Sequence, residues 1–197
     1  MLKIQKDYLS KYGNIKDNYN ERLDYLLNNT KLKNKDVYNE ISRISSITWN
    51  KLSYIIYLLP KGTPRPRCGK HGVFYVKDAK KYKKLFEDFA KVNDITLITT
   101  PTKFHCISYL PIPSTMKPVD KVLAELGFIR PTSKPDWDNL AKCYCDMIQD
   151  ILLYDDSLII EGSSKKFYSV KPRIEVYIEY MNDYDCDFNR NKINRKE

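Results

Sequence analysis

The sequence predicts an α+β fold, in which a mixed β-sheet packs with a few helices behind a helical N-terminal extension. Three observations predict it. The run IEVYIEY near the C-terminus alternates as a half-buried strand does, several segments carry apolar residues at helical spacing, and the composition changes near residue 50. The 197 residues suffice for one domain with a buried core and extensions. We expect the extension over 1–50, the domain over 51–181 and a polar, flexible tail over 182–197.

The extension is rich in Asn, Lys and Tyr and lacks proline. We expect one helix over 17–28 and a second from Asn34, which is a good N-cap residue and precedes a stripe of Val37, Ile41 and Ile44. The stripe favours docking on the core or on a second subunit. A DNA-contacting arm is the alternative, although the charge of the extension is mixed.

The sequence predicts four strands and one helix in the first half of the domain. A helix capped by Asp78 and running to Val92 would bury Tyr82, Leu85, Phe86 and Phe89. Apolar, β-branched or aromatic runs predict strands over 54–59, 73–76, 95–99 and 104–110.

The second half predicts two helices and two strands. A short helix over 119–126 is closed by Gly127, at the position after a helix that glycine favours. An acidic helix over 138–151 follows, with an apolar face at the 3.6-residue period. Strands over 158–167 and 173–180 complete the domain.

The formal net charge of +9 indicates an acidic partner such as nucleic acid. No apolar run is long enough to cross a membrane, and the N-terminus lacks the apolar segment of a signal peptide. Five cysteines without a CxxC spacing do not favour a zinc site and fit a reducing compartment. We therefore expect a cytoplasmic protein without a membrane partner or a nucleotide cofactor.

Acidic residues gather at both ends of the acidic helix in this basic chain. Asp138 alone could be an N-cap, but Asp136 two positions earlier has no such structural role. Two neighbouring carboxylates repel unless a cation lies between them, and Mg²⁺ prefers oxygen ligands. The Asp155-Asp156 pair follows an apolar run and precedes a strand, which suits either a second half of the same metal site or a surface turn.

Lys142 lies one helical turn beyond Asp138, and Asp146 one turn further. An ordinary ion pair between Asp138 and Lys142 would explain the first spacing. Alternatively, the Lys142 ammonium faces a scissile phosphate and Asp146 orients it. The metal and the lysine together would hydrolyse a phosphodiester.

These residues resemble a known family, the RusA-type Holliday junction resolvases, whose signature is approximately D-x-D-N-x-x-K-x-x-x-D and then D-D. The resemblance covers about two thirds of the chain, from residue 53 to 180. Its parts occur in order: PKGTPRPR at 60–67, YLPIPS at 109–114, KPDWDNLAKCYCD at 134–146, YDDS at 154–157 and PRIEVYIEY at 172–180.

The resemblance implies a RusA-like nuclease domain that acts as a homodimer with Mg²⁺, for which Mn²⁺ substitutes. It also implies that the cytoplasm is that of a bacterium or a phage-infected host. The domain would cut four-way DNA junctions by paired nicks that leave 5′-phosphate and 3′-hydroxyl ends. Asp136, Asp138 and Asp156 match the essential carboxylates, which are both catalytic and metal-binding. Lys142 matches the essential lysine, and Asp155 the less critical member of the acidic pair.

Four features depart from the family pattern. Pro135 stands where a basic residue is common, Trp137 where a smaller aliphatic residue is usual, and Leu158 where glutamine is common. The first 50 residues have no counterpart in the compact members. These departures leave the metal site intact and bear on the choice of junction.

DNA contacts are expected from residues around the acidic motif. A proline-stiffened loop carries basic side chains with few packing residues nearby, which favours contact with phosphates. Lys80, Lys81, Lys83 and Lys84 fit either DNA contact or a solvated helix face. The predicted DNA-binding residues are Lys61, Arg65, Arg67, Lys134 and Asn139.

Three other functions compete with a junction resolvase. The chain could be a catalytically silent DNA-binding protein, or a nuclease for a broader range of branched DNA. A PD-(D/E)xK nuclease fits Pro135-Asp136, but the strand that follows offers no (D/E)xK triplet.

Overall fold

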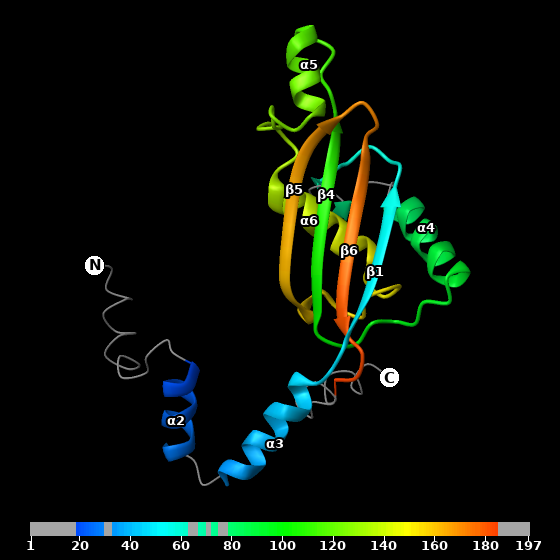
Figure 1. Cartoon of the computed structure of the whole chain (residues 1–197). Coiled ribbons are helices and arrows are strands. Elements are labelled where there is room, and N and C mark those ends of the chain that lie inside the picture. Colours follow the sequence, from blue (N-terminus) through cyan, green and yellow to red (C-terminus); the bar gives the residue numbers. More distant parts are fainter. Residues whose placement is uncertain (1–18, 30–32, 63–66, 70–71, 75–78, 185–197) are drawn as a thin grey trace. The chain divides into compact units, whose positions relative to one another are not determined.

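The computed structural model describes residues 19–29, 33–62, 67–69, 72–74 and 79–184, and the side chains of 63–82 lie outside this description (Figure 1). The chain divides into two compact units, Met1–Ile47 and Thr48–Glu197. The expected boundaries at 50 and 181 stay predictions. In the described part of the chain, no helix is long and apolar enough to span a membrane.

The first unit contains α2 (Tyr19–Asn29) and α3 (Asn34–Ser45), close to the expected helices. Lys33, rather than Asn34, occupies the N-cap position of α3. Neither helix has a buried residue, and Tyr19, Leu26 and Tyr38 are about half exposed. The stripe residues Val37 and Ile41 are only partly buried, so the described residues of the unit do not cover this stripe fully.

The second unit is built on a sheet of four strands within the described residues, in the order β1-β6-β4-β5. These strands are β1 (Trp49–Ile56), β4 (Thr102–Pro111), β5 (Ile159–Ser169) and β6 (Arg173–Met181). β6 pairs antiparallel with β1 and β4, whereas β4 and β5 are parallel. The α+β fold with a mixed sheet is thus confirmed.

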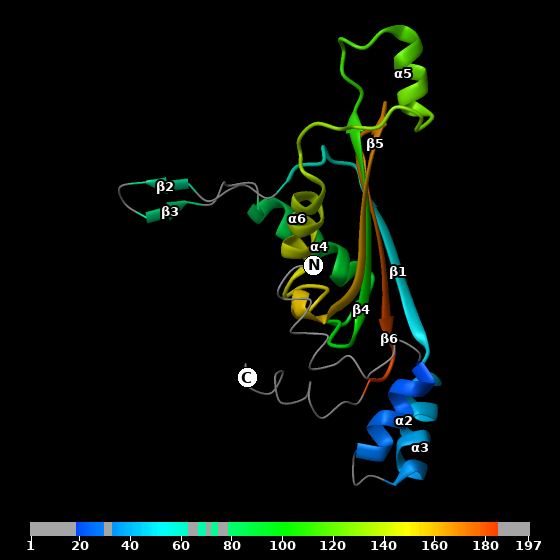
Figure 2. The same cartoon turned by 90° about the vertical axis from the view of Figure 1, so that its left-hand side faces the viewer.

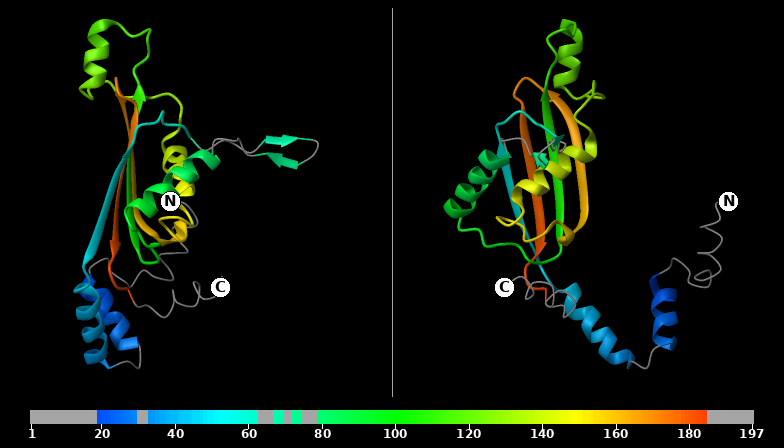
Figure 3. Two further views of the ribbon diagram at one scale, coloured as in Figure 1. Left: turned by 90° about the vertical axis from the view of Figure 1, so that its right-hand side faces the viewer. Right: turned by 180° about the vertical axis from the view of Figure 1, so that it is seen from behind.

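One face of this sheet is covered by α4 (Ala79–Val92) and α6 (Trp137–Ile148) (Figures 2 and 3). Alternate residues of β4 and β6 point toward them, including Phe104, Cys106 and Val176, which are almost fully buried. On α6, the side chains of Leu140 and Ile148 are completely buried. The core between sheet and helices fixes the position of α6.

The opposite face of the sheet carries charged residues together with Ile55 and Tyr177, which are about half exposed. Lys51, Glu179, Lys103 and Glu161 follow one another across the four strands, and the outer two pairs form ion pairs of 3.6 Å. Alternating charges directly opposite each other stabilise neighbouring strands and suit a surface in contact with water.

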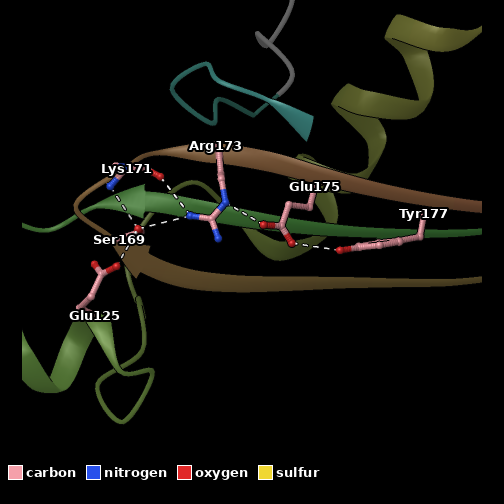
Figure 4. Close-up of polar contacts among 6 residues, drawn as sticks. All are labelled: Glu125, Ser169, Lys171, Arg173, Glu175 and Tyr177. Carbon is pink, nitrogen blue, oxygen red and sulfur yellow. Dashed lines mark hydrogen bonds and ion pairs between the residues drawn. The ribbon is translucent and has the colours of Figure 1, made fainter. Parts of the chain in front are cut away.

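A short helix, α5 (Pro118–Glu125), is tied to the turn between β5 and β6 (Figure 4). The Glu125 carboxylate accepts hydrogen bonds from the Ser169 hydroxyl at 3.1 Å and from the Val170 backbone N–H at 2.6 Å. Gly127 has φ +82°, which favours glycine just after a helix, as the sequence predicts.

Some expected elements differ. The strand over 95–99 is wrong: in this segment only Ile98 forms a bridge, to Leu153, because no strand lies alongside for the rest to pair with. Of the short strand expected over 73–76, residues 73 and 74 lie in β3 (Gly72–Phe74), which pairs with β2 (Arg67–Gly69), and residues 75 and 76 lie outside the described residues. β1 begins five residues before the expected 54, since its whole length pairs with β6. Leu85 is 43% exposed rather than buried.

Candidate active site

The first pair of acidic residues lies at the N-terminus of α6. Asp136 occupies the N-cap position in an extended conformation, but its side chain makes no capping hydrogen bond. Asp138 lies inside the first turn, so the N-cap position belongs to Asp136, for which the sequence predicts no such role, and not to Asp138. Both residues are exposed. Among the described residues, neither carboxylate takes part in a hydrogen bond or an ion pair, which leaves both available to a cation.

The start of α6 is held against β5. The Trp137 indole N–H donates to the Ser164 carbonyl oxygen at 2.6 Å, and the Ser164 hydroxyl donates to the Trp137 carbonyl oxygen at 3.2 Å. The Lys166 ammonium donates to the carbonyl oxygens of Ser133 and Pro135, at 2.8 and 2.9 Å. The loop and the first turn that carry the two acids are therefore fixed from the same strand.

The lysine of the motif has an ion-pair partner further along the helix. Lys142 Nζ lies 3.8 Å from Asp146 Oδ1, one turn toward the C-terminus, and its side chain is 63% exposed. The ordinary ion pair between Lys142 and Asp138, which would also explain their spacing, is not formed among the described residues. Asp146 is thus placed to orient Lys142, as expected if the Lys142 ammonium faces a scissile phosphate.

Asp146 also links this lysine electrostatically to the second acidic pair. Burial raises the pKa of the Asp146 carboxyl above its ordinary value; the Lys142 ammonium opposes this shift, and the Asp156 carboxylate adds to it. Asp156 therefore lies within electrostatic range of the second half of α6. Burial likewise raises the pKa of the neighbouring Cys145 thiol to about 12, so this cysteine is not a nucleophile at neutral pH.

The two members of the second acidic pair differ in their surroundings. Asp155 is partly buried, and its carboxylate accepts a hydrogen bond from the Ser157 N–H at 2.9 Å. Asp156 begins the 3₁₀ turn Asp156–Leu158 and is exposed. Asp155 thus shapes the turn that presents Asp156, a division that agrees with its less critical status in the resemblance.

The predicted metal ligands have suitable chemistry but are not assembled. Carboxylate oxygens are what Mg²⁺ prefers. Within the described residues, however, no three His, Cys, Asp or Glu side chains are grouped to hold a metal ion. Asp138 and Asp146 are separated along α6 by about 12 Å, at 1.5 Å per residue. Asp156 interacts electrostatically with Asp146, which lies two turns along α6 from Asp138. The assignment of Asp136, Asp138 and Asp156 to one ion therefore stays a prediction.

The loop that follows β1 approaches the same place. A Cβ added to Gly62 would lie 2.5 Å from Asn139 Nδ2 and 3.5 Å from Pro135 Cβ. Lys61, next to this glycine, is exposed, as is Lys134. Lys61, Lys134 and Asn139 thus surround the start of α6. Arg65 lies outside the described residues, and Arg67 is described only in its backbone, within β2.

Sequence reasoning did not identify Ser164 or Lys166. Their spacing of two on β5 places them on the same face, which the strand pattern could have shown. Their hydrogen bonds to residues 133, 135 and 137 cross about 30 positions of chain, and no local pattern reveals that pairing. A hollow of about 580 Å³ beside α5, lined by Ile112, Val122 and Val170 among others, includes none of the predicted site residues.

Comparison with known proteins identifies the family. The model of "Endodeoxyribonuclease RusA" matches residues 58–179, a range that contains β4, β5 and all of α6. The chain belongs to the RusA family of endodeoxyribonucleases. It is also 33% identical to the uncharacterized protein YqaN of Bacillus subtilis (strain 168) over 134 residues, which cover 64% of this chain and 94% of YqaN. The RusA match includes the whole motif from Asp136 to Asp156 and excludes both helices of the first unit.

Proposed function

We propose that this RusA-family chain is a Mg²⁺-dependent endodeoxyribonuclease that resolves four-way DNA junctions as a homodimer in the cytoplasm. Paired nicks would leave 5′-phosphate and 3′-hydroxyl ends. The observation that carries the proposal is the position of Asp136 and Asp138 and the availability of their carboxylates. Both lie inside the matched family region, at a helix start anchored to β5, with carboxylates that no described neighbour occupies.

In this proposal Asp136, Asp138 and Asp156 hold the ion. Bound Mg²⁺ would supply an activated water and neutralise charge on the phosphate. Lys142 acts beside it: its ammonium is mostly exposed, and Asp146 holds it from the side away from Asp138. An ammonium fixed in this way can stabilise the charge that develops on the phosphoryl oxygens.

DNA would be held by basic and amide groups next to the acids, because the acidic site alone repels phosphate. Lys61, Lys134 and Asn139 lie at the start of α6, and Arg65 and Arg67 belong to the chain segment that continues from Gly62. A two-fold dimer would present two such sites to the two strands of a junction that are nicked.

A cleavage assay tests the proposal. Four-way, three-way, flap and linear duplex DNA are incubated with the protein in Mg²⁺, in Mn²⁺ and in EDTA. We expect four-way junctions to be nicked in pairs in Mg²⁺ or Mn²⁺ only. Asp138→Asn should reduce the rate at least about 100-fold, since a metal ligand matters more than the outer groups whose loss costs 10- to 100-fold. Asp120→Asn is the matched control, because Asp120 lies in the first turn of α5.

Each competing function has its own outcome in this assay. Cleavage of three-way and flap DNA at the junction rate would identify a nuclease with a broader range of branched substrates. Binding to junctions without cleavage in either metal would identify a silent DNA-binding protein and refute the proposal.

A further inference from the structure

Trp137 combines a fixed polar edge with a residue surface that is more than half exposed. It is the first residue of α6, between the two predicted metal ligands Asp136 and Asp138, and its residue surface is 57% exposed. Single exposed apolar residues are common and need no function. The position of this indole, at the centre of the acidic motif in a basic nuclease domain, makes its exposure informative.

The indole is held at its polar edge. Its N–H donates to the Ser164 carbonyl oxygen at 2.6 Å, and the Trp137 carbonyl oxygen accepts from the Ser164 hydroxyl at 3.2 Å. Lys166, two residues along the same strand, holds the two preceding carbonyl oxygens of Ser133 and Pro135. A ring fixed in this way loses little conformational entropy when a ligand covers it.

A role in anchoring the helix explains why residue 137 has an N–H donor, but not why it has a large aromatic ring. A hydrogen-bonding side chain of any kind could tie the helix to β5, whereas a large flat ring that stays more than half exposed gains only part of the free energy of burial. Aromatic rings beside a nucleic-acid backbone site serve as platforms on which bases stack, because every base has a π-face. A continuous duplex already stacks its bases on each other, and only a branch or an end presents a base face cheaply.

We propose that the Trp137 indole stacks on a base exposed at the branch point and so positions branched DNA over the neighbouring carboxylates. This inference rests on the proposed function, which it deepens by naming a positioning residue that selects branched DNA over linear duplex. Trp137 touches the substrate without taking part in the chemistry of the phosphate.

Binding measurements with matched variants test the stacking. Trp137→Phe and Trp137→Leu both lose the N–H bond to Ser164, so the two share any anchoring defect and differ in the flat ring. All variants carry Asp138→Asn, so that the DNA is not cut. We expect Trp137→Leu to weaken four-way junction binding about 5- to 140-fold, the range for losing one stacked base. Trp137→Phe should retain most of the affinity, and linear duplex binding should be the same in all three proteins.

Fluorescence provides a second readout that a structural role would not move. The chain has two tryptophans, so Trp49→Phe leaves Trp137 as the sole indole. With Asp138→Asn, we expect its emission to be quenched by a four-way junction and not by linear duplex. Thermal unfolding of each variant shows whether the fold is retained.

The outcomes separate this inference from the proposed function. If the wild type cuts four-way junctions but Trp137→Leu binds them as tightly as Trp137→Phe and shows no loss against Asp138→Asn alone, the stacking is wrong and the nuclease stands. Equal weakening in both variants, without quenching, reduces Trp137 to an anchor and also overturns the stacking. If the wild type neither cuts nor prefers branched DNA, the proposed function fails and this inference with it.

Discussion

The folded protein disfavours the ionised form of the Asp146 carboxyl. Burial raises the pKa of its carboxyl above the ordinary 3.8, and the Lys142 ammonium only partly offsets this. The folded state therefore binds the proton more strongly than the unfolded state does. The resulting destabilisation is complete above the raised pKa and disappears as the pH falls toward the ordinary value.

We accordingly expect Asp146→Asn to raise the unfolding midpoint at pH 7 slightly, and this gain to shrink as the pH is lowered toward 4. The gain is small because the side chain is 40% exposed. Thermal unfolding at several pH values measures it, with the exposed Asp183→Asn as control. A lower midpoint at pH 7 would mean that the Lys142 ion pair outweighs the burial of the charge. Junction cleavage should fall in the same variant, because Lys142 loses the group that orients it.

At the scale of elements, β5 supports the site through alternate residues. Ser164 and Lys166 face α6 and hold the segment from Ser133 to Trp137, whereas Lys165 is exposed on the other face of the strand. A strand is a rigid support, and it lets the Ser164 and Lys166 side chains fix the loop through hydrogen bonds to its backbone carbonyl oxygens.

Lys166→Met tests this support. Methionine keeps the apolar stem but removes the charged donor to Ser133 and Pro135, and hydrogen bonds to charged groups contribute about 1.5–3 kcal/mol. We expect a loss of stability within that range and a larger fractional loss of cleavage, because the Asp136 and Asp138 carboxylates are no longer fixed. Lys165→Met removes the same charge from the neighbouring position and should leave both properties nearly unchanged. An equal loss of cleavage in the two variants, with stability unchanged in both, would assign the loss to DNA electrostatics instead of to loop support.

The sequence predicts those elements whose signal is local. The amphipathic period of α6, the glycine after α5 and the alternation in β6 all lie within one element, and each of these elements is found within a few residues of its expected bounds. The run from Ile95 to Thr99 has the composition of a strand, but among the described residues only Ile98 forms a bridge, to Leu153, and no local pattern shows that the rest lacks a partner strand. Likewise the motif identifies Asp136 and Asp138, whereas the bonds to Ser164 and Lys166 depend on packing of α6 on β5.

At the scale of the whole molecule, the first unit stands apart from the family match. Its helices bury none of their described residues, and the RusA match begins at residue 58, after the end of β1 at Ile56. β1 itself belongs to the second unit, where it pairs with β6 along its full length. The natural boundary for dissection therefore lies between Ile47 and Thr48 and not inside the strand.

A chain that begins at Thr48 should fold on its own. It keeps the bond from Asn182 N–H to the Thr48 carbonyl oxygen, of 2.9 Å, and every strand of the main sheet. We expect its unfolding midpoint to change by less than about 3 °C, the shift that about 1 kcal/mol causes in a protein of this size. Light scattering on the full and shortened chains then reports whether residues 1–47 contribute to association, and a junction assay whether they contribute to cleavage. A chain that begins at Leu52, which lacks the first three residues of β1, is the control and should be clearly less stable. If the chain from Thr48 unfolds as early as that control, the extension stabilises the nuclease domain, and the division of the molecule at this point is wrong.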